Sequence, residues 1–141
     1  MAYLFRQKLN ISELVDLAQA PKRILIHEPE EYLSALYAHY LRAHNFDVKH
    51  CPNWDKISAM VKSFRPQVFI FSADALVPHT NVKIWGLLSG LVSDFPNLKL
   101  ISTGLGNSSP LKELMAAGVL GHINRKLSRP QDLAIIVKSI L

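Results

Sequence analysis

The sequence contains a single cysteine, Cys51, among its 141 residues. One cysteine excludes an internal disulfide and fits a reducing compartment. No apolar run approaches the roughly 18 residues needed to span a bilayer. The opening run MAYLFRQKLN also lacks the basic-then-apolar order of a signal peptide. These absences predict a cytoplasmic protein without a membrane segment.

A run of basic residues is also missing, although the formal net charge is +5. The sixteen Lys and Arg residues are spread along the chain, and only Arg125, Lys126 and Arg129 form a local cluster. There is no zinc-finger spacing and no aromatic RNA-binding segment, so a solvated basic face is favoured over a nucleic-acid partner. The six histidines show no metal-ligand spacing with Cys51, and we expect no metal site from them.

What is present is the composition of one globular domain, with 49% apolar and 19% charged residues. Residues 1–21 stand apart from the rest. Their apolar residues fall near helical spacing before Pro21 breaks the pattern, which predicts an N-terminal amphipathic helix. The main domain is expected over 22–141. The apolar positions of the predicted helix are Leu9, Ile11, Leu14, Val15 and Ala18.

From residue 22 onward, apolar strand-like runs alternate with helical patterns. The alternation predicts a doubly wound five-stranded parallel sheet covered by helices on both faces, a flavodoxin-like (βα)5 fold. Gly118 is expected to end the fourth helix, and Ser128 with Gln131 to cap the fifth as a capping box. Strands are expected over 23–26, 46–50, 67–72, 98–102 and 120–124, and helices over 29–44, 54–64, 82–93, 109–118 and 129–140.

Five segments, in order, resemble a response-regulator receiver domain. RILIHEPEE is similar to its first strand with an acidic pair, PQVFIFS to its central strand, and LISTG to its fourth strand. AGVLGHINRKL and SRPQDL are similar to its fifth strand and the start of its last helix. The resemblance covers about residues 22–141.

The resemblance also shows departures at the phosphoacceptor pocket. The acidic pair is Glu28-Pro29, and Ser72 stands where the family carries the aspartate that accepts phosphate. Since Mg²⁺ prefers several oxygen ligands in octahedral array, we expect Mg²⁺ binding to be weak or absent, with no other cofactor. The pocket residues that the resemblance implies are Glu28, Pro29, Ser72, Thr103 and Arg125, with His122 at the family's aromatic switch position.

Three residues that lie close in sequence to the pocket residues have competing interpretations. Ser102 is an alternative to Thr103 because the alignment is uncertain by one residue. Asp74 is a rescue candidate for the missing acceptor, but its place in the loop favours a solvent-facing or turn-capping role. For His27, a core-facing, hydrogen-bonded imidazole is favoured over a catalytic base.

The resemblance implies a non-catalytic, phosphorylation-independent module that binds protein partners in two-component or phosphorelay signalling. A homodimer through the N-terminal helix, or through the face made by the fourth helix, fifth strand and fifth helix, stays open. So do two other functions: an atypical receiver phosphorylated on Ser72 or Asp74, and a small anionic-ligand-binding domain using TGLG and Arg125. The predicted interaction face comprises Leu111, Lys112, Met115, Lys126, Arg129 and Gln131.

Overall fold

The computed structural model describes residues 2–4, 7–9, 20–74, 76, 82–105 and 110–141. A five-stranded parallel sheet forms the centre of the domain, in the order β4-β3-β5-β6-β7. Its strands are β3 (Arg23–His27), β4 (Asp47–His50), β5 (Val68–Ser72), β6 (Lys99–Gly104) and β7 (Val119–Asn124). The predicted fold class is therefore confirmed, with every strand within two residues of its expected bounds.

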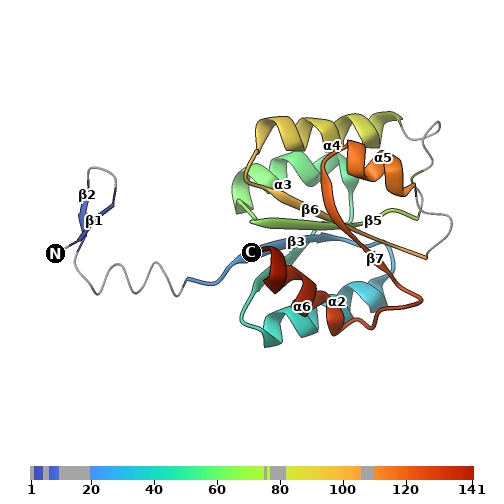
Figure 1. The fold of residues 1–141 in the computed structure, drawn as a ribbon, viewed down its shortest axis with the longest axis horizontal. Coiled ribbons are helices and arrows are strands. Elements are labelled where there is room, and N and C mark those ends of the chain that lie inside the picture. Colours follow the sequence, from blue (N-terminus) through green and yellow to red (C-terminus); the bar gives the residue numbers. More distant parts are fainter. Residues whose placement is uncertain (1, 5–6, 10–19, 75, 77–81, 106–109) are drawn as a thin grey trace.

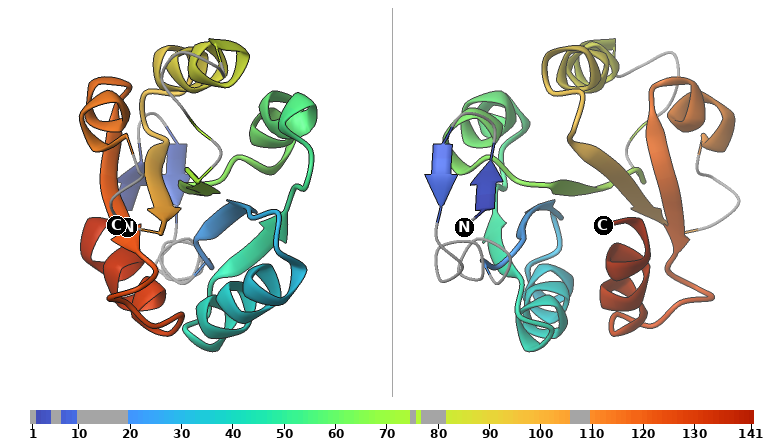
Figure 2. Two further views of the ribbon diagram at one scale, coloured as in Figure 1. Left: turned by 90° about the vertical axis from the view of Figure 1, so that its right-hand side faces the viewer. Right: turned by 60° about the vertical axis from the view of Figure 1, so that its left-hand side comes forward.

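Helices cover both faces of this sheet (Figures 1 and 2). One face carries the two helices α2 (Glu31–Ala43) and α6 (Asp132–Ile140). The other carries α3 (Ile57–Phe64), preceded by the 3-10 turn η1 (Trp54–Lys56), with α4 (Val82–Asp94) and α5 (Leu111–Ala116). No helix among the described residues is long and apolar enough to cross a membrane.

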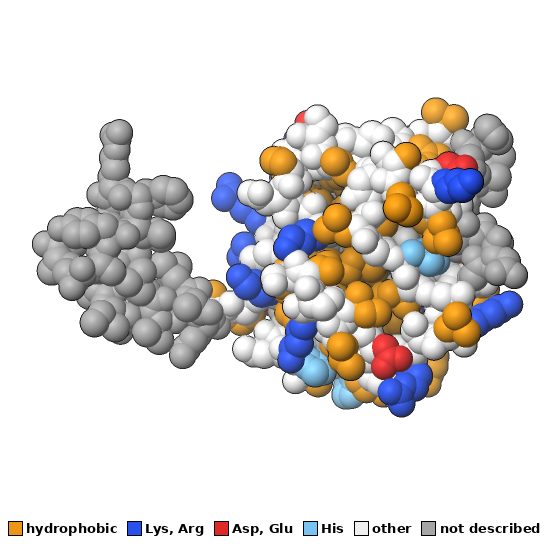
Figure 3. Space-filling view, viewed as in Figure 1, with side chains coloured by type: hydrophobic (Ala, Val, Ile, Leu, Met, Phe, Trp, Pro, Cys, Tyr) orange, Lys and Arg blue, Asp and Glu red, His pale blue; other side chains and the backbone are white. Residues whose placement is uncertain are grey.

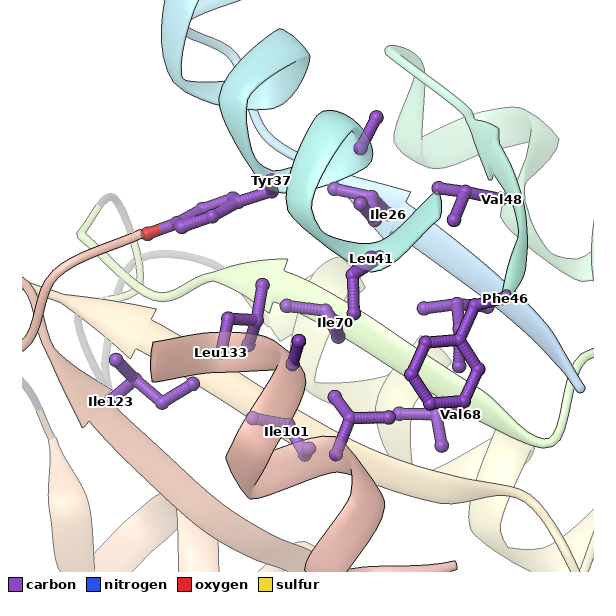
Figure 4. Close-up of a cluster of buried hydrophobic side chains, with 14 residues drawn as sticks. Ile26, Tyr37, Leu41, Phe46, Val48, Val68, Ile70, Ile101, Ile123 and Leu133 are labelled. Carbon is purple, nitrogen blue, oxygen red and sulfur yellow. The ribbon is translucent and has the colours of Figure 1, made fainter. Parts of the chain in front are cut away.

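The alternation of side chains along β5 explains why both faces are covered. Val68 and Ile70 pack with α2 and α6, whereas Phe69 and Phe71 pack with α3 and α4. Figure 4 shows Leu41 of α2 reaching toward Ile70 in the first of these two clusters. All five residues of β5 are buried, so this strand lies at the centre of the core. Its last residue, Ser72, lies at the carboxyl end of the parallel strands.

Part of the N-terminal extension is described. Residues Ala2–Leu4 (β1) and Gln7–Leu9 (β2) form an antiparallel pair of short strands, which includes only Leu9 of the apolar positions of the predicted helix. The other four positions fall within residues 10–19, which lie outside the described residues, so this helix stays a prediction.

Two helix ends test the capping predictions. Gly118 follows the C-cap Ala117 with φ +99, so the predicted C′ glycine of α5 is confirmed. The predicted capping box of α6 is wrong: the helix begins at Asp132, whose Oδ2 accepts a hydrogen bond from the Arg129 N–H at 2.9 Å. The N-cap is Gln131, whose side chain makes no capping hydrogen bond, and the Asp132 carboxylate instead binds the backbone that leads into the helix.

Candidate functional site

Four strands deliver polar residues to one edge of the sheet, on the right in Figure 1. Glu28 follows β3, Ser72 closes β5, Thr103 lies in β6 and Arg125 follows β7. The parallel register places Ser72 beside Thr103, and the Ala73 N–H donates to the Thr103 carbonyl at 2.8 Å. The residues that the sequence assigned to one pocket therefore do lie at one edge. Pro29 follows Glu28 as an exposed residue and brings no ligand atom.

Arg125 joins two carboxylates across this edge. Its Nη1 lies 3.4 Å from Glu28 Oε1, and its Nη2 contacts Asp74 Oδ2. The exposed fractions of the Arg125, Glu28 and Asp74 side chains are 14%, 5% and 30%. The Arg125 N–H also donates to the Gly104 carbonyl at 2.8 Å. The guanidinium is thus held between groups that follow β3 and β5.

Asp74 lies at this site and is still partly open to solvent, in agreement with the solvent-facing or turn-capping role favoured from the sequence. Its Oδ1 accepts a hydrogen bond from the Leu105 N–H at 2.9 Å, while its Oδ2 meets Arg125. Asp74 therefore caps the start of the loop after β6 and pairs with the cation at the same time. Sequence spacing does not reveal this, because its partners are 31 and 51 positions away.

Burial dominates the electrostatics of Glu28. Removal from water raises the pKa of its carboxyl group, and the Arg125 guanidinium and the Glu30 N–H only partly oppose that rise. Tyr37 on α2 feels the same charges, and burial raises its pKa to about 12. Its hydroxyl points away from the labelled apolar cluster in Figure 4. An ionised Glu28 is therefore costly here and depends on the cation beside it.

The hydroxyl groups of the site point to two sides of the sheet. Ser102 Oγ lies 2.7 Å from His122 Nδ1, whereas its neighbour Thr103 lies beside Ser72. Thr103 is therefore the residue in position to share a pocket with Ser72. His27 is confirmed as a core-facing imidazole, because its Nδ1 lies 2.9 Å from the Cys51 carbonyl and burial lowers its pKa.

His122 occupies a half-buried place on β7. Its Nδ1 contacts Ser102, whereas its Nε2 is buried and has no hydrogen-bond partner among the described residues. Burial lowers the pKa of the imidazole, so the neutral ring is favoured. A cavity of about 260 Å³ lies between this ring and α5, and Leu114 and Val119 contribute to its lining.

The predicted interaction face is largely open to solvent. Leu111 and Met115 of α5 are 47% and 74% exposed, and Lys112, Lys126 and Arg129 are also exposed, with Gln131 half-buried. Sequence reasoning missed Leu120, which is 62% exposed in β7. The strand pairing skips this residue, passing from Val119 to Gly121, and the resulting bulge turns an apolar side chain outward.

The donor set gives no ready metal site. In the described part of the chain, no group of three or more His, Cys, Asp or Glu residues lies close enough to hold a metal ion. The two carboxylates nearest the expected position, Glu28 and Asp74, both contact Arg125. A guanidinium brings only N–H donors and cannot share those oxygens with a divalent cation without moving. The residues present therefore fit Mg²⁺ poorly.

Comparison with known proteins shows which solved structures have a similar fold. No protein-family model and no curated protein sequence matches the chain. Among solved structures, a response regulator from Thermotoga maritima is similar with a TM-score of 0.72 and 13% identity, over 85% of this chain and 97% of that one. A CheY-like receiver domain protein from Methanospirillum hungatei JF-1 has a TM-score of 0.70 and 19% identity, over 85% and 93%.

An orphan response regulator of H. pylori also has a TM-score of 0.70, at 11% identity, over 85% of this chain and 96% of that one. At such low identities these likenesses establish the fold alone. Over about 85% of its length, the chain therefore shares the flavodoxin-like α/β fold of response-regulator receiver domains.

Proposed function

We propose that this chain is a non-catalytic, receiver-like signalling module that acts through protein contacts and without aspartyl phosphorylation. One observation carries the proposal: the Arg125 guanidinium lies between the Glu28 and Asp74 carboxylates, while β5 ends in Ser72. Under this proposal the guanidinium occupies the carboxylate oxygens that a divalent cation would otherwise need.

The chemistry around Ser72 supports the same proposal. A serine hydroxyl needs a nearby base to act as a nucleophile. The imidazole nearest in sequence to the pocket, His27, is bound to the Cys51 carbonyl and packs against Trp54 with ring centroids 4.3 Å apart. Its ring therefore belongs to the α3 side of the sheet. Under this proposal Mg²⁺ binds weakly or not at all.

Signal output is assigned to the predicted interaction face together with Leu120. Exposed Leu111, Met115 and Leu120 surround the small cavity next to His122, and exposed Lys and Arg residues flank them. An apolar centre with a charged rim is the usual anatomy of a protein interface. A cytoplasmic protein partner, or a second copy of this chain, would bury these side chains.

An amide NMR titration with Mg²⁺ and then beryllofluoride, which mimics a phosphoryl group on aspartate, tests the proposal. We expect no saturable shifts near Glu28, Ser72, Asp74 and Thr103. Saturable shifts there would show a working phosphoacceptor pocket and overturn the proposal. Sedimentation velocity with Met115→Glu and Leu120→Glu then tests the second-copy alternative, since a dimer through this face should dissociate in both variants.

Asp74 supports one second candidate, an atypical receiver that still accepts phosphate. Its carboxylate lies in the site, and its side chain is 30% exposed. Incubation with acetyl phosphate and intact-mass measurement would reveal an added phosphate. Loss of that mass in Asp74→Asn would assign it to Asp74, and loss in Ser72→Ala to Ser72. The anionic-ligand alternative loses support, because Arg125 already has two carboxylate partners, and part of TGLG lies outside the described residues.

A further inference from the structure

A second cavity lies at the opposite end of the sheet, where β5 and β6 begin. Its volume is about 550 Å³, within the range of about 300–1,000 Å³ typical of small-molecule sites. The connections from α3 to β5 and from α4 to β6 form its walls. The lining residues are Val61, Lys62, Arg65, Pro66, Gln67, Asp94, Phe95, Pro96, Asn97 and Leu98.

Hydrogen bonds hold both walls in place. The Arg65 N–H donates to the Val61 carbonyl at 2.9 Å, and Arg23 Nε donates to the Arg65 carbonyl at 3.1 Å. On the other wall, the Leu98 N–H donates to the Phe95 carbonyl at 3.0 Å. The cavity is therefore preformed, and a ligand would not have to order its walls.

The apolar part of the lining continues the core. Val61 is buried, and Phe95 and Leu98 pack against the cluster beneath α3 and α4. Pro66 is buried beside them. The partly buried Phe95 and Leu98 keep apolar surface that the apolar body of a ligand would cover.

The polar part of the lining carries unpaired charge. Lys62 and Arg65 are exposed, and Asp94 is the one acidic residue among the lining residues. Four ion pairs join described residues, and none of them includes these three side chains. Figure 3 shows Lys and Arg side chains gathered on the side of the domain where the chain enters it. The local field at the cavity favours an anion.

We propose that this cavity binds a small organic anion with an apolar body, such as an aromatic carboxylate. The apolar body lies against Val61, Phe95 and Leu98, and the carboxylate meets Lys62 and Arg65. The planar fork of an arginine matches a carboxylate with two parallel hydrogen bonds. This site is separate from the edge that holds Arg125, so it stands whether or not the proposed signalling function does.

The test is an amide NMR titration of the full chain with 4-phenylbutyrate, 4-phenyl-1-butanol and butyrate. We expect saturable shifts at Arg65, Gln67, Phe95, Asn97 and Leu98 with phenylbutyrate, and much weaker ones with the neutral alcohol or with butyrate. Absence of saturable shifts at these residues, or equal binding of the alcohol, would overturn the proposal.

Charge variants give a signed test. Lys62→Gln and Arg65→Gln should each weaken phenylbutyrate binding about two- to fivefold, as expected for one exposed ion pair. Asp94→Asn should tighten binding, because it removes a repelling carboxylate. Lys56→Gln is the matched control, because Lys56 is exposed and lies just before the first residue of α3, away from the cavity. It should leave the affinity for phenylbutyrate unchanged. Equal effects of the Lys62 and Lys56 variants would show a general charge effect and no site.

Discussion

Arg125 Nη1 lies 3.4 Å from Glu28 Oε1, although 97 positions separate the two residues. The contact joins the group that follows β7 to the one that follows β3, and β5 and β6 lie between those strands in the sheet. The Arg125 side chain is long enough to contact a second carboxylate, that of Asp74, so one cation pairs with two carboxylates. The cation that balances part of the pocket's negative charge therefore comes from within the chain.

Arg125→Gln should destabilise the domain and make it responsive to Mg²⁺. Removing one partner of a fully buried pair costs about 3–5 kcal/mol, and we expect about 2 kcal/mol here because Asp74 is partly exposed. The released carboxylates would then favour a divalent cation, and a ligand that binds the folded state stabilises it. Urea unfolding with and without millimolar Mg²⁺ measures both effects. Arg129→Gln, which removes an exposed pair with Asp132, is the control.

Absence of a Mg²⁺ effect in Arg125→Gln would contradict the idea that this guanidinium stands in place of a metal. A Mg²⁺ effect of equal size in the wild-type chain would do the same.

Glu28→Gln should change the pH dependence of stability. The folded-state pKa of Glu28 is raised above its ordinary value of 4.5, chiefly by burial. Below that value its contribution is fully present, and it is lost as the pH rises through the folded pKa. The unfolding free energy of Glu28→Gln minus that of the wild type should therefore increase from about pH 4.5 upward. Urea unfolding over this window measures it, with Glu31→Gln on exposed α2 surface as a charge-matched control. A difference that stays constant with pH would contradict the prediction.

His122→Phe should remove part of the acid sensitivity of the domain. Burial lowers the folded-state pKa of His122 from its ordinary 6.5, so its stabilising contribution is present above 6.5 and lost as the pH falls through the folded value. Urea unfolding between pH 7 and 5 should show a shallower loss of stability in the phenylalanine variant. Part of the slope should remain, because the pKa of His27 is lowered in the same direction. An unchanged slope would show that His122 does not titrate there.

The same substitution leaves the buried Ser102 hydroxyl without its partner, which lies at 2.7 Å. An unsatisfied buried group costs about 1–3 kcal/mol, so His122→Phe and Ser102→Ala should be less destabilising together than their sum. Additive single effects would show that the two residues are not coupled.

The sequence predicts the sheet because the signal for it is local. The inner strands such as β5 are short apolar runs, β4 alternates polar with apolar residues, and Gly118 marks a helix end by its own backbone preference. The start of α6 is less predictable, because Ser128 is a suitable N-cap by residue type and yet the backbone path starts the helix four residues later, at Asp132. Local pattern therefore defines the elements and leaves their exact ends open.

The site was only half predictable for a different reason. The positions of Glu28, Ser72 and Thr103 at the site can be predicted, because each lies at or near the end of a strand. The role of Asp74 depends on the folded positions of Leu105 and Arg125. Leu120 likewise depends on a bulge between neighbouring strands. Neither long-range event has a signature in a window of neighbouring residues, because each depends on the pairing of distant segments.

Two positions with positive φ should respond to substitution with opposite signs. Arg65 has φ 52 at the C-cap of α3, a conformation that costs an L-residue about 1–2 kcal/mol. Arg65→Gly relieves this cost but adds about 0.5–1 kcal/mol of backbone entropy, so stability should be unchanged or up to about 1.5 kcal/mol higher. Urea unfolding measures it, and a clear loss of stability would show that the Arg65 side chain itself supports the fold.

Gly118→Ala should instead be destabilising. Its φ is +99, and an added Cβ would come within 2.9 Å of Val92 Cγ2 on α4. We expect a loss of about 2 kcal/mol, more than a compatible glycine-to-alanine change would gain. Because part of this loss comes from the contact, it should shrink when Val92→Ala is combined with it, while the backbone part remains. An undiminished loss in the double variant would assign the whole effect to backbone strain at residue 118.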